Sequence, residues 1–228
     1  MKPLIGFDMD GVIIDSEDFS EANWIAAAFM KTLAEFGIPK SEENARALYV
    51  KNMRENSAAF CQRFGIDDPH LLWDRREAHY VAEKLAALEA GRIHLYQDVS
   101  ALERLSRNYS LGLVSNSPQT VVDRVIAHFS LERLFRVWIG RGSVLADLHR
   151  AKPAPDMLNE MKTLIGTDHG YYVGDQPEDV EAARAASLHP ILLTRNGISG
   201  HIHTHTVLGD FLKRQTGLRA RGIESLSD

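Results

Sequence analysis

Two aspartates near the start of the chain, Asp8 and Asp10, lie between two apolar runs in the stretch IGFDMDGVIIDSE. The apolar residues are typical of a buried strand that leads into a tight turn. Carboxylates at the end of such a strand cost free energy of desolvation unless a partner compensates them. A metal ion or a chemical task would supply that compensation, although an Asp-Gly pair is also common in ordinary turns.

Further polar residues follow later apolar segments or precede the next helix. These are Ser115, Asn116, Lys152, Asp175 and Asp179. Because ligands of an open parallel sheet gather at the carboxyl ends of its strands, we expect carboxylates, a hydroxyl and a lysine to meet in one crevice. Agreement between separate segments favours a functional site over a turn. Ser115 and Asn116 could also cap a helix.

The expected side chains suit phosphoryl transfer. Clustered carboxylates repel one another and favour a hard cation such as Mg²⁺, while Lys152 and Ser115 could hold phosphate oxygens. Asp8 would attack phosphorus and form an aspartyl-phosphate. Asp10 would protonate the leaving oxygen and later deprotonate the water that hydrolyses the intermediate.

The segments that contain these residues alternate between strand and helix patterns. Short apolar runs predict strands at 110–116, 136–140, 170–175 and 189–194 after the first strand, and a weaker edge strand at 204–208. Helical patterns lie between them, at 99–107, 118–129, 153–165 and 177–187. This alternation predicts an α/β fold with a doubly wound parallel sheet.

The interval from about residue 16 to residue 91 breaks the alternation, because its apolar residues follow only a helical period. Ser41 can cap a second helix, and Asp68 followed by Pro69 can begin a third. About 75 residues without a strand are too many for a crossover loop. We therefore expect an inserted all-helical cap domain.

The predicted division of the chain follows from this insertion. The α/β core would comprise residues 1–15 and 92–228, and the cap would comprise residues 16–91. Hinges between the two domains are expected near Asp15–Ser16 and around 90–98.

The composition narrows the class of protein. The chain has 228 residues and a net charge of −5, without a basic footprint for nucleic acid. No apolar run is long enough to span a bilayer, and the first strand begins too early for a signal peptide. The single cysteine, Cys61, cannot form an internal disulfide. We expect a cytoplasmic monomer or homodimer whose partner is a small phosphorylated metabolite, not a nucleic acid or a membrane.

Four motifs, taken in order, resemble those of the haloacid dehalogenase superfamily. They are DMDGVIIDSE, LVSNS, the lysine of AKPAPDML and VGDQPEDVEAARAA, and they span residues 8 to 186. Each motif is weak singly, but the ordered set is specific. The match is similar to the phosphatase branch with a helical cap, which includes phosphoglycolate phosphatases and β-phosphoglucomutases. The resemblance implies a phosphoric monoester hydrolase.

The resemblance also implies a role for each matched residue. Asp8 corresponds to the nucleophile and Asp10 to the general acid and base. Ser115, Asn116 and Lys152 correspond to phosphate-binding residues.

The implied cofactor is Mg²⁺. The resemblance assigns its ligands to Asp8, the backbone carbonyl of Asp10, and Asp175. Asp179 would support them directly or through water.

Two further groups have open interpretations. Cap residues choose the substrate in this family, and Lys51 and Arg54 in YVKNMREN are candidates, although they could also belong to a solvated helix face. His201, His203 and His205 would share one face of a strand, as possible metal ligands or as ordinary surface histidines.

Three alternatives compete with hydrolysis. A phosphomutase would use the same Asp8 chemistry, but mutase-like members of the family have an acidic residue where this chain has Gly174. A catalytically silent binding module would be expected to lack Asp8 or Asp10, and both are present. A signalling receiver domain also has an acidic pair and a Lys-Pro. There the Lys-Pro follows every acidic element, whereas here GDQPED follows Lys152.

Overall fold

The computed structural model of this protein describes residues 2–16, 23–195 and 208. His201, His203 and His205 lie outside the described residues, as do the tail beyond residue 208 and the predicted edge strand at 204–208 except for Leu208. Among the described helices, none has both the length and the apolarity that crossing a membrane requires.

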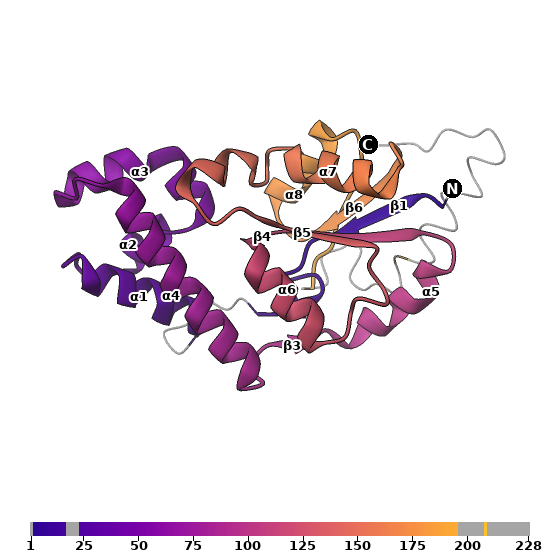
Figure 1. The fold of residues 1–228 in the computed structure, drawn as a ribbon, viewed down its shortest axis with the longest axis horizontal. Helices are drawn as coiled ribbons and strands as arrows, with labels where there is room; N and C mark the ends of the chain where they lie inside the picture. Colours follow the sequence, from indigo (N-terminus) through magenta and orange to yellow (C-terminus); the bar gives the residue numbers. More distant parts are fainter. Residues whose placement is uncertain (1, 17–22, 196–207, 209–228) are drawn as a thin grey trace.

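A five-stranded parallel sheet forms the centre of the molecule, with the strand order β5-β4-β1-β6-β7 (Figure 1). Its strands are β1 (Leu4–Phe7), β4 (Ser110–Pro118), β5 (Val137–Arg141), β6 (Gly170–Gly174) and β7 (His189–Leu192). The chain starts in the middle strand, adds β4 and β5 on one side, and then adds β6 and β7 on the other. This is a doubly wound order, so the predicted fold class is confirmed.

Helices cover both faces of the sheet (Figure 1). One face has α7 (Asp156–Ile165) and α8 (Pro177–Ala185), and the other has α5 (Leu102–Ser106) and α6 (Gln119–His128). Along β1, Leu4 packs in the cluster that contains α7 and α8, whereas Ile5 packs in the cluster that contains α5 and α6. Successive strand residues point to opposite faces, so both must be apolar.

Two predicted helices differ from the structure at their starts. The first, predicted at 99–107, is a 3₁₀ helix, η1 (Gln97–Ala101), that continues as α5. The second, predicted at 153–165, begins only at Asp156, after a 3₁₀ helix, η2 (Leu145–Arg150). Ala154 precedes Pro155, and a residue before proline is disfavoured in the helical conformation, which delays the start.

Four helices occupy the interval between the first two strands of the sheet in the sequence, β1 and β4. They are α1 (Trp24–Glu35), α2 (Glu42–Ala47), α3 (Val50–Phe64) and α4 (Pro69–Glu89). Ser41 caps α2 and Asp68 caps α4, as predicted, because each side chain accepts a backbone N–H of the first turn. A break at Leu48 and Tyr49 separates α2 from α3, so the described part of this helical insertion has four helices where the sequence indicated three.

A two-stranded antiparallel ribbon connects the helical insertion to the sheet. Its strands are β2 (Ile14–Asp15) and β3 (His94–Leu95), which pair with each other. Both connections between the two parts of the molecule therefore lie side by side. The predicted hinge positions fall at this ribbon.

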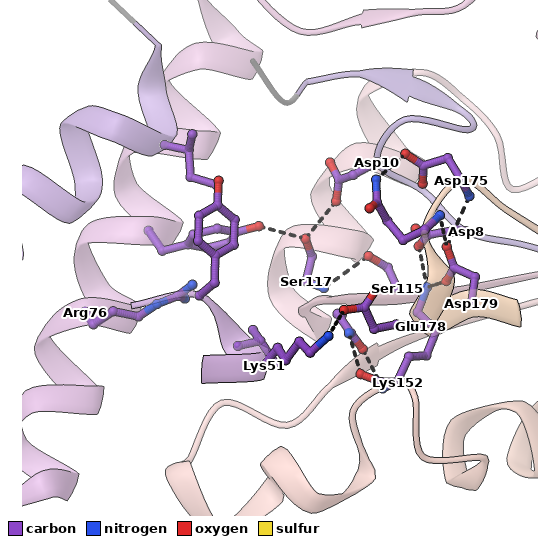
Figure 2. A pocket seen from close by; sticks show the side chains of 16 residues that line it. Asp8, Asp10, Lys51, Arg76, Ser115, Ser117, Lys152, Asp175, Glu178 and Asp179 are labelled. Carbon is purple, nitrogen blue, oxygen red and sulfur yellow. Dashed lines mark hydrogen bonds and ion pairs between the residues drawn. The ribbon is translucent and has the colours of Figure 1, made fainter. Parts of the chain in front are cut away.

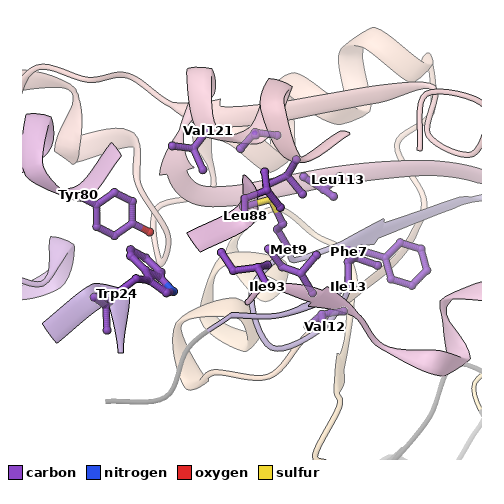
Figure 3. Packing of buried hydrophobic residues seen from close by; sticks show 14 of the residues in the cluster. Phe7, Met9, Val12, Ile13, Trp24, Tyr80, Leu88, Ile93, Leu113 and Val121 are labelled. Atoms are coloured by element: carbon purple, nitrogen blue, oxygen red, sulfur yellow. The ribbon is translucent and has the colours of Figure 1, made fainter. Parts of the chain in front are cut away.

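One hydrophobic cluster runs from the sheet into the helical insertion (Figure 3). It includes Phe7 and Leu113 of the sheet, Met9 of the turn after β1, and Trp24 and Tyr80 of the insertion. Burial of apolar surface is the main favourable term in folding, so the insertion is held by packing as well as by the ribbon.

Candidate active site

The carboxyl end of the sheet brings the predicted residues together. Asp8 directly follows β1, and its backbone N–H donates to the carbonyl of Val173 in β6 at 2.8 Å. Strands β4 and β6 flank β1, so this is the point at which the winding direction reverses. The predicted residues that line the cavity there are Asp8, Asp10, Lys51, Ser115, Asn116, Lys152, Asp175 and Asp179 (Figure 2).

The cavity has a volume of about 340 Å³, which suits a small metabolite. Its far side is formed by the helical insertion, with Ile25, Tyr49, Val50, Arg76 and Tyr80. The substrate space therefore lies between the sheet and the insertion.

Three carboxylates form an acidic cluster on the sheet side. Asp8, Asp175 and Asp179 each have an oxygen within 4.8 Å of the others. Lys152 is buried among them, with its Nζ 2.8 Å from Asp8 Oδ1 and 2.6 Å from Asp179 Oδ1. One ammonium against three carboxylates leaves an excess of negative charge.

The pKa values reflect this crowding. Burial raises the pKa of Asp8 well above its usual range; Lys152 opposes the rise, and Asp179 adds to it. Burial is also the main reason that the pKa of Asp175 rises to about 6. For Lys152, burial lowers the pKa, but Asp179 and Asp8 outweigh it and raise the pKa well above its usual range. The protein alone therefore does not fully stabilise the ionised carboxylates.

The acidic cluster has the oxygen donors that Mg²⁺ prefers. Asp175 Oδ1 is buried and has no hydrogen-bond partner among the described residues. Asp179, in contrast, is occupied at both oxygens: Oδ1 by Lys152, and Oδ2 by the backbone N–H groups of Asp175 and Gln176, each at 3.1 Å. Asp8 and Asp175 therefore fit direct metal ligation better, and Asp179 fits the supporting role.

Asn116 holds the backbone of Lys152. Its Oδ1 accepts the Lys152 N–H at 2.8 Å, and its Nδ2 donates to the Lys152 carbonyl at 3.0 Å. These two bonds position the lysine, and the second Nδ2 proton of Asn116 can still donate to a phosphate oxygen. Ser115 Oγ accepts the N–H of Ser117 at 3.1 Å, so the Ser115 hydroxyl can still donate its proton to a ligand.

Of the two insertion residues that the sequence singled out, only Lys51 lines the cavity. Its Nζ lies 2.8 Å from Glu178 Oε1 of α8. This partly exposed pair joins the insertion to the core at the edge of the cavity, which we call the rim. The hydrogen bond to Glu178 raises the pKa of Lys51. Arg54 instead donates to the Ala151 carbonyl at 3.1 Å, outside the residues that line the cavity.

Arg76 on α4 is a buried cavity residue that the sequence interpretation missed. Its Nε donates to the Leu48 carbonyl at 3.0 Å and its Nη1 to Glu77 Oε2 at 2.9 Å. Burial lowers its pKa to about 10, so it remains charged at neutral pH. Glu77 in turn accepts both terminal nitrogens of Arg141 in β5, at 2.7 and 2.8 Å.

Lys84 and Ser117 were missed as well, and both contact Asp10. A sequence signal existed: Arg76, Tyr80 and Lys84 recur at intervals of four residues, which places them on one face of α4. A row of two cations and a tyrosine on a helix that also has buried apolar residues indicates a face turned toward a polar site.

Comparisons with known proteins match most of the chain. A family model described as haloacid dehalogenase-like hydrolase matches residues 5–193. The chain is 29% identical over 202 residues to a phosphoglycolate phosphatase of Aliivibrio fischeri, covering 84% of this chain and 83% of the relative. It is 28% identical over 235 residues to a phosphoglycolate phosphatase of Yersinia pestis, covering 98% and 95%.

A solved structure has a similar fold. It is the crystal structure of CbbY from Rhodobacter sphaeroides in complex with phosphate. The TM-score is 0.61 at 21% identity, with 88% of this chain and 92% of that chain covered. The likeness extends over the sheet and the helical insertion together.

Proposed function

This chain belongs to the haloacid dehalogenase-like hydrolase family, and we propose that it is a Mg²⁺-dependent phosphatase that hydrolyses a small phosphate monoester through an aspartyl-phosphate on Asp8. The main observation behind this proposal is the contact of Lys152 with Asp8 inside the acidic cluster. A nucleophile, a cation for the phosphate and ligands for a metal thus lie together. The names of the curated relatives support the same reaction.

In the first step, an oxygen of the Asp8 carboxylate bonds to phosphorus while the bond between phosphorus and the ester oxygen breaks. Asp10 gives a proton to that oxygen, so the product leaves as an alcohol. Lys152 and the Ser115 hydroxyl bind phosphoryl oxygens and stabilise the charge that develops on them.

In the second step, a water molecule attacks phosphorus and Asp10 accepts its proton. The bond between phosphorus and Asp8 breaks, which releases inorganic phosphate and restores the carboxylate. Mg²⁺, held by Asp8, Asp175 and the Asp10 backbone carbonyl, would supply positive charge to the transferring phosphoryl group.

The substrate we propose is a small ester with a second anionic group, and phosphoglycolate is the first candidate. The relatives named above are phosphoglycolate phosphatases. Arg76 lines the insertion side of the cavity and shares the single carboxylate of Glu77 with Arg141 of β5, which leaves one positive charge. A carboxylate on the substrate would balance that charge.

The helical insertion is proposed to act as the cap, with residues 16–91 closing over the ester. Its contacts with the core across the rim, from Lys51 to Glu178 and from Arg54 to Ala151, would help to exclude bulk water. A closed cavity also strengthens the electrostatic contacts within it.

Gly174 favours hydrolysis over a mutase reaction. A Cβ at this position would lie 2.2 Å from Asp179 Cβ and 2.3 Å from Asp179 Oδ2. The acidic residue that mutase-like members have there would therefore require Asp179 to move.

The test measures inorganic phosphate release from phosphoglycolate, sugar phosphates, nucleoside monophosphates and p-nitrophenyl phosphate, with Mg²⁺ or with EDTA. We expect Mg²⁺-dependent release, and a loss of about 10³-fold or more in Asp8→Asn. Asp168→Asn, the same change at an exposed aspartate, is the control. No release from any ester would contradict the proposal, and interconversion of glucose phosphates without release would replace it with the mutase reaction.

A further inference from the structure

A buried lysine of the helical insertion pairs with the acid/base candidate of the core. Lys84 on α4 is fully buried, and its Nζ lies 2.6 Å from Asp10 Oδ1. Burying an ammonium costs several kcal/mol unless a charged partner compensates it. Lys84 is not among the described residues that line the cavity, whereas Asp10 is. The lysine therefore contacts Asp10 from behind and is not placed to touch the substrate.

The hydrogen bonds around Lys84 leave little freedom. Its ammonium donates to Asp10 Oδ1, to Ser117 Oγ at 3.1 Å and to Tyr80 OH at 3.3 Å, so each of its three protons has an acceptor. Ser117 Oγ donates to Asp10 Oδ2 at 3.0 Å. Because that uses its only proton, the 3.0 Å contact between Ser117 and Tyr80 must have the Tyr80 hydroxyl as donor.

This network distinguishes the two oxygens of Asp10. Oδ1 accepts from Lys84 and from the Ser16 hydroxyl, so both of its lone pairs are in use. Oδ2 accepts only from Ser117 among the described residues, which leaves one lone pair on that oxygen. The proton that Asp10 moves during the reaction therefore belongs on Oδ2.

We infer that Lys84 is a positioning residue: it fixes the Asp10 carboxylate so that Oδ2 is presented to the ester oxygen. Without the ammonium, the carboxylate could rotate and lose its alignment with the substrate. Because Lys84 is on the insertion and Asp10 is on the core, proton transfer is competent only while α4 is docked against the sheet. The inference rests on the proposed function, in which Asp10 moves the proton.

The test compares two leaving groups in single-turnover experiments with Mg²⁺. Phosphoglycolate, or another alkyl ester that the wild type hydrolyses, needs a proton on its leaving oxygen, whereas p-nitrophenolate leaves without one. We expect Lys84→Met to slow cleavage of the alkyl ester by about 10²-fold. The same variant should slow the release of p-nitrophenol by about tenfold at most. KM for the alkyl ester should change little, because Lys84 does not line the cavity. Lys84→Arg should restore part of the lost rate.

Two further variants keep the test decisive. Lys31→Met removes the ammonium of α1 that forms an exposed ion pair with Glu83, the neighbour of Lys84 on α4. This variant should leave both rates unchanged. If Lys84→Met does not fold, as its melting temperature would reveal, Ser117→Ala removes the donor to Asp10 Oδ2. The same selective loss for the alkyl ester is then expected.

The outcomes separate the inference from the proposed function. Equal losses for both leaving groups, or no loss for either, would overturn the role of Lys84 while the wild type still releases phosphate. A wild type that releases no phosphate from either ester would overturn the proposed function and the inference together.

Discussion

The two sides of the cavity have an excess of opposite charge, and neither excess is balanced by the side chains of its own side. On the sheet side, three carboxylates face the single ammonium of Lys152. On the insertion side, Arg76 of α4 shares the single carboxylate of Glu77 with Arg141, which reaches it from β5 of the core. Figure 2 shows Arg76 across the cavity from Asp8 and Asp175.

The difference indicates what the cavity binds. Buried groups with excess charge are unfavourable unless a ligand or a proton balances them. A metal ion would balance the sheet side, and an anionic group of the substrate would balance the insertion side. The two excesses are separate, so each can be perturbed without the other.

The largest expected effect comes from removing the shared carboxylate on the insertion side. Glu77→Gln would leave Arg76 and Arg141, both 1% exposed, without their common partner. Removing the charge of one partner from a buried ion pair is strongly destabilising, because the other charge stays buried without compensation. We therefore expect the free energy of unfolding to fall by about 3–5 kcal/mol. Urea denaturation followed by circular dichroism measures it.

The control for this prediction is on the same helix. Glu89→Gln breaks an exposed pair with Arg124, and it should cost less than about 1 kcal/mol. Equal small losses in both variants would mean that the insertion side carries no buried charge excess.

A smaller effect is expected from the pH dependence of the metal-free protein. The pKa of Asp175 is raised to about 6, mainly by burial, against about 3.9 in an unfolded chain. Between these values the folded state holds a proton that the unfolded state has released. The Asp175 contribution to stability is therefore complete below about pH 4 and is lost as the pH rises through 6, by up to about 3 kcal/mol.

The measurement compares melting temperatures in EDTA and in Mg²⁺ at pH 5 and pH 7.5. Mg²⁺ binds the ionised carboxylates, so its stabilising effect should be larger at pH 7.5. Asp175→Asn removes the group and should flatten the pH dependence in EDTA. An Mg²⁺ effect of the same size at both pH values would contradict the excess of negative charge on the sheet side.

The smallest of the three effects concerns the remaining positive charge. Arg76→Met keeps an apolar chain among the rings of Phe29, Trp73 and Tyr80, and Glu77 stays paired with Arg141. We expect kcat/KM for phosphoglycolate to fall by about 10–100-fold, with a clearly smaller loss for p-nitrophenyl phosphate, which has no second anionic group. Steady-state kinetics with both esters measure the difference, and equal losses would rule out the carboxylate contact.

The sheet side could be predicted from the sequence because several of its residues lie at or directly after the ends of recognisable strands. Asp8 comes directly after the first apolar run, and Asp175 comes directly after the fourth segment of the sheet. Parallel strands present their carboxyl ends at one edge, so the pattern of strands was enough to bring Asp8, Ser115 and Asp175 together.

The insertion side could not be predicted in the same way. Arg75 and Arg76 are neighbours in the sequence, yet Arg75 is exposed beside Glu35 and Arg76 is buried in the cavity wall. The spacing of Arg76, Tyr80 and Lys84 places them on one face of α4, but a helix so rich in charge has no clear apolar stripe to show that this face, among its charged faces, is the one turned inward. The residues that the sequence singled out, Lys51 and Arg54, lie instead on α3, at the rim and beside the core.

The sequence by itself determined the doubly wound core, the presence of a helical insertion and the grouping of acidic residues, because these follow from local periodicity and from the ends of strands. Only the tertiary structure decided that Lys84 meets Asp10 and that Glu77 meets Arg141. Each of these pairs joins the insertion to the core. Its partners depend on how α4 docks against the sheet, and that docking is set by the packing of side chains distant in the sequence, which local patterns do not encode.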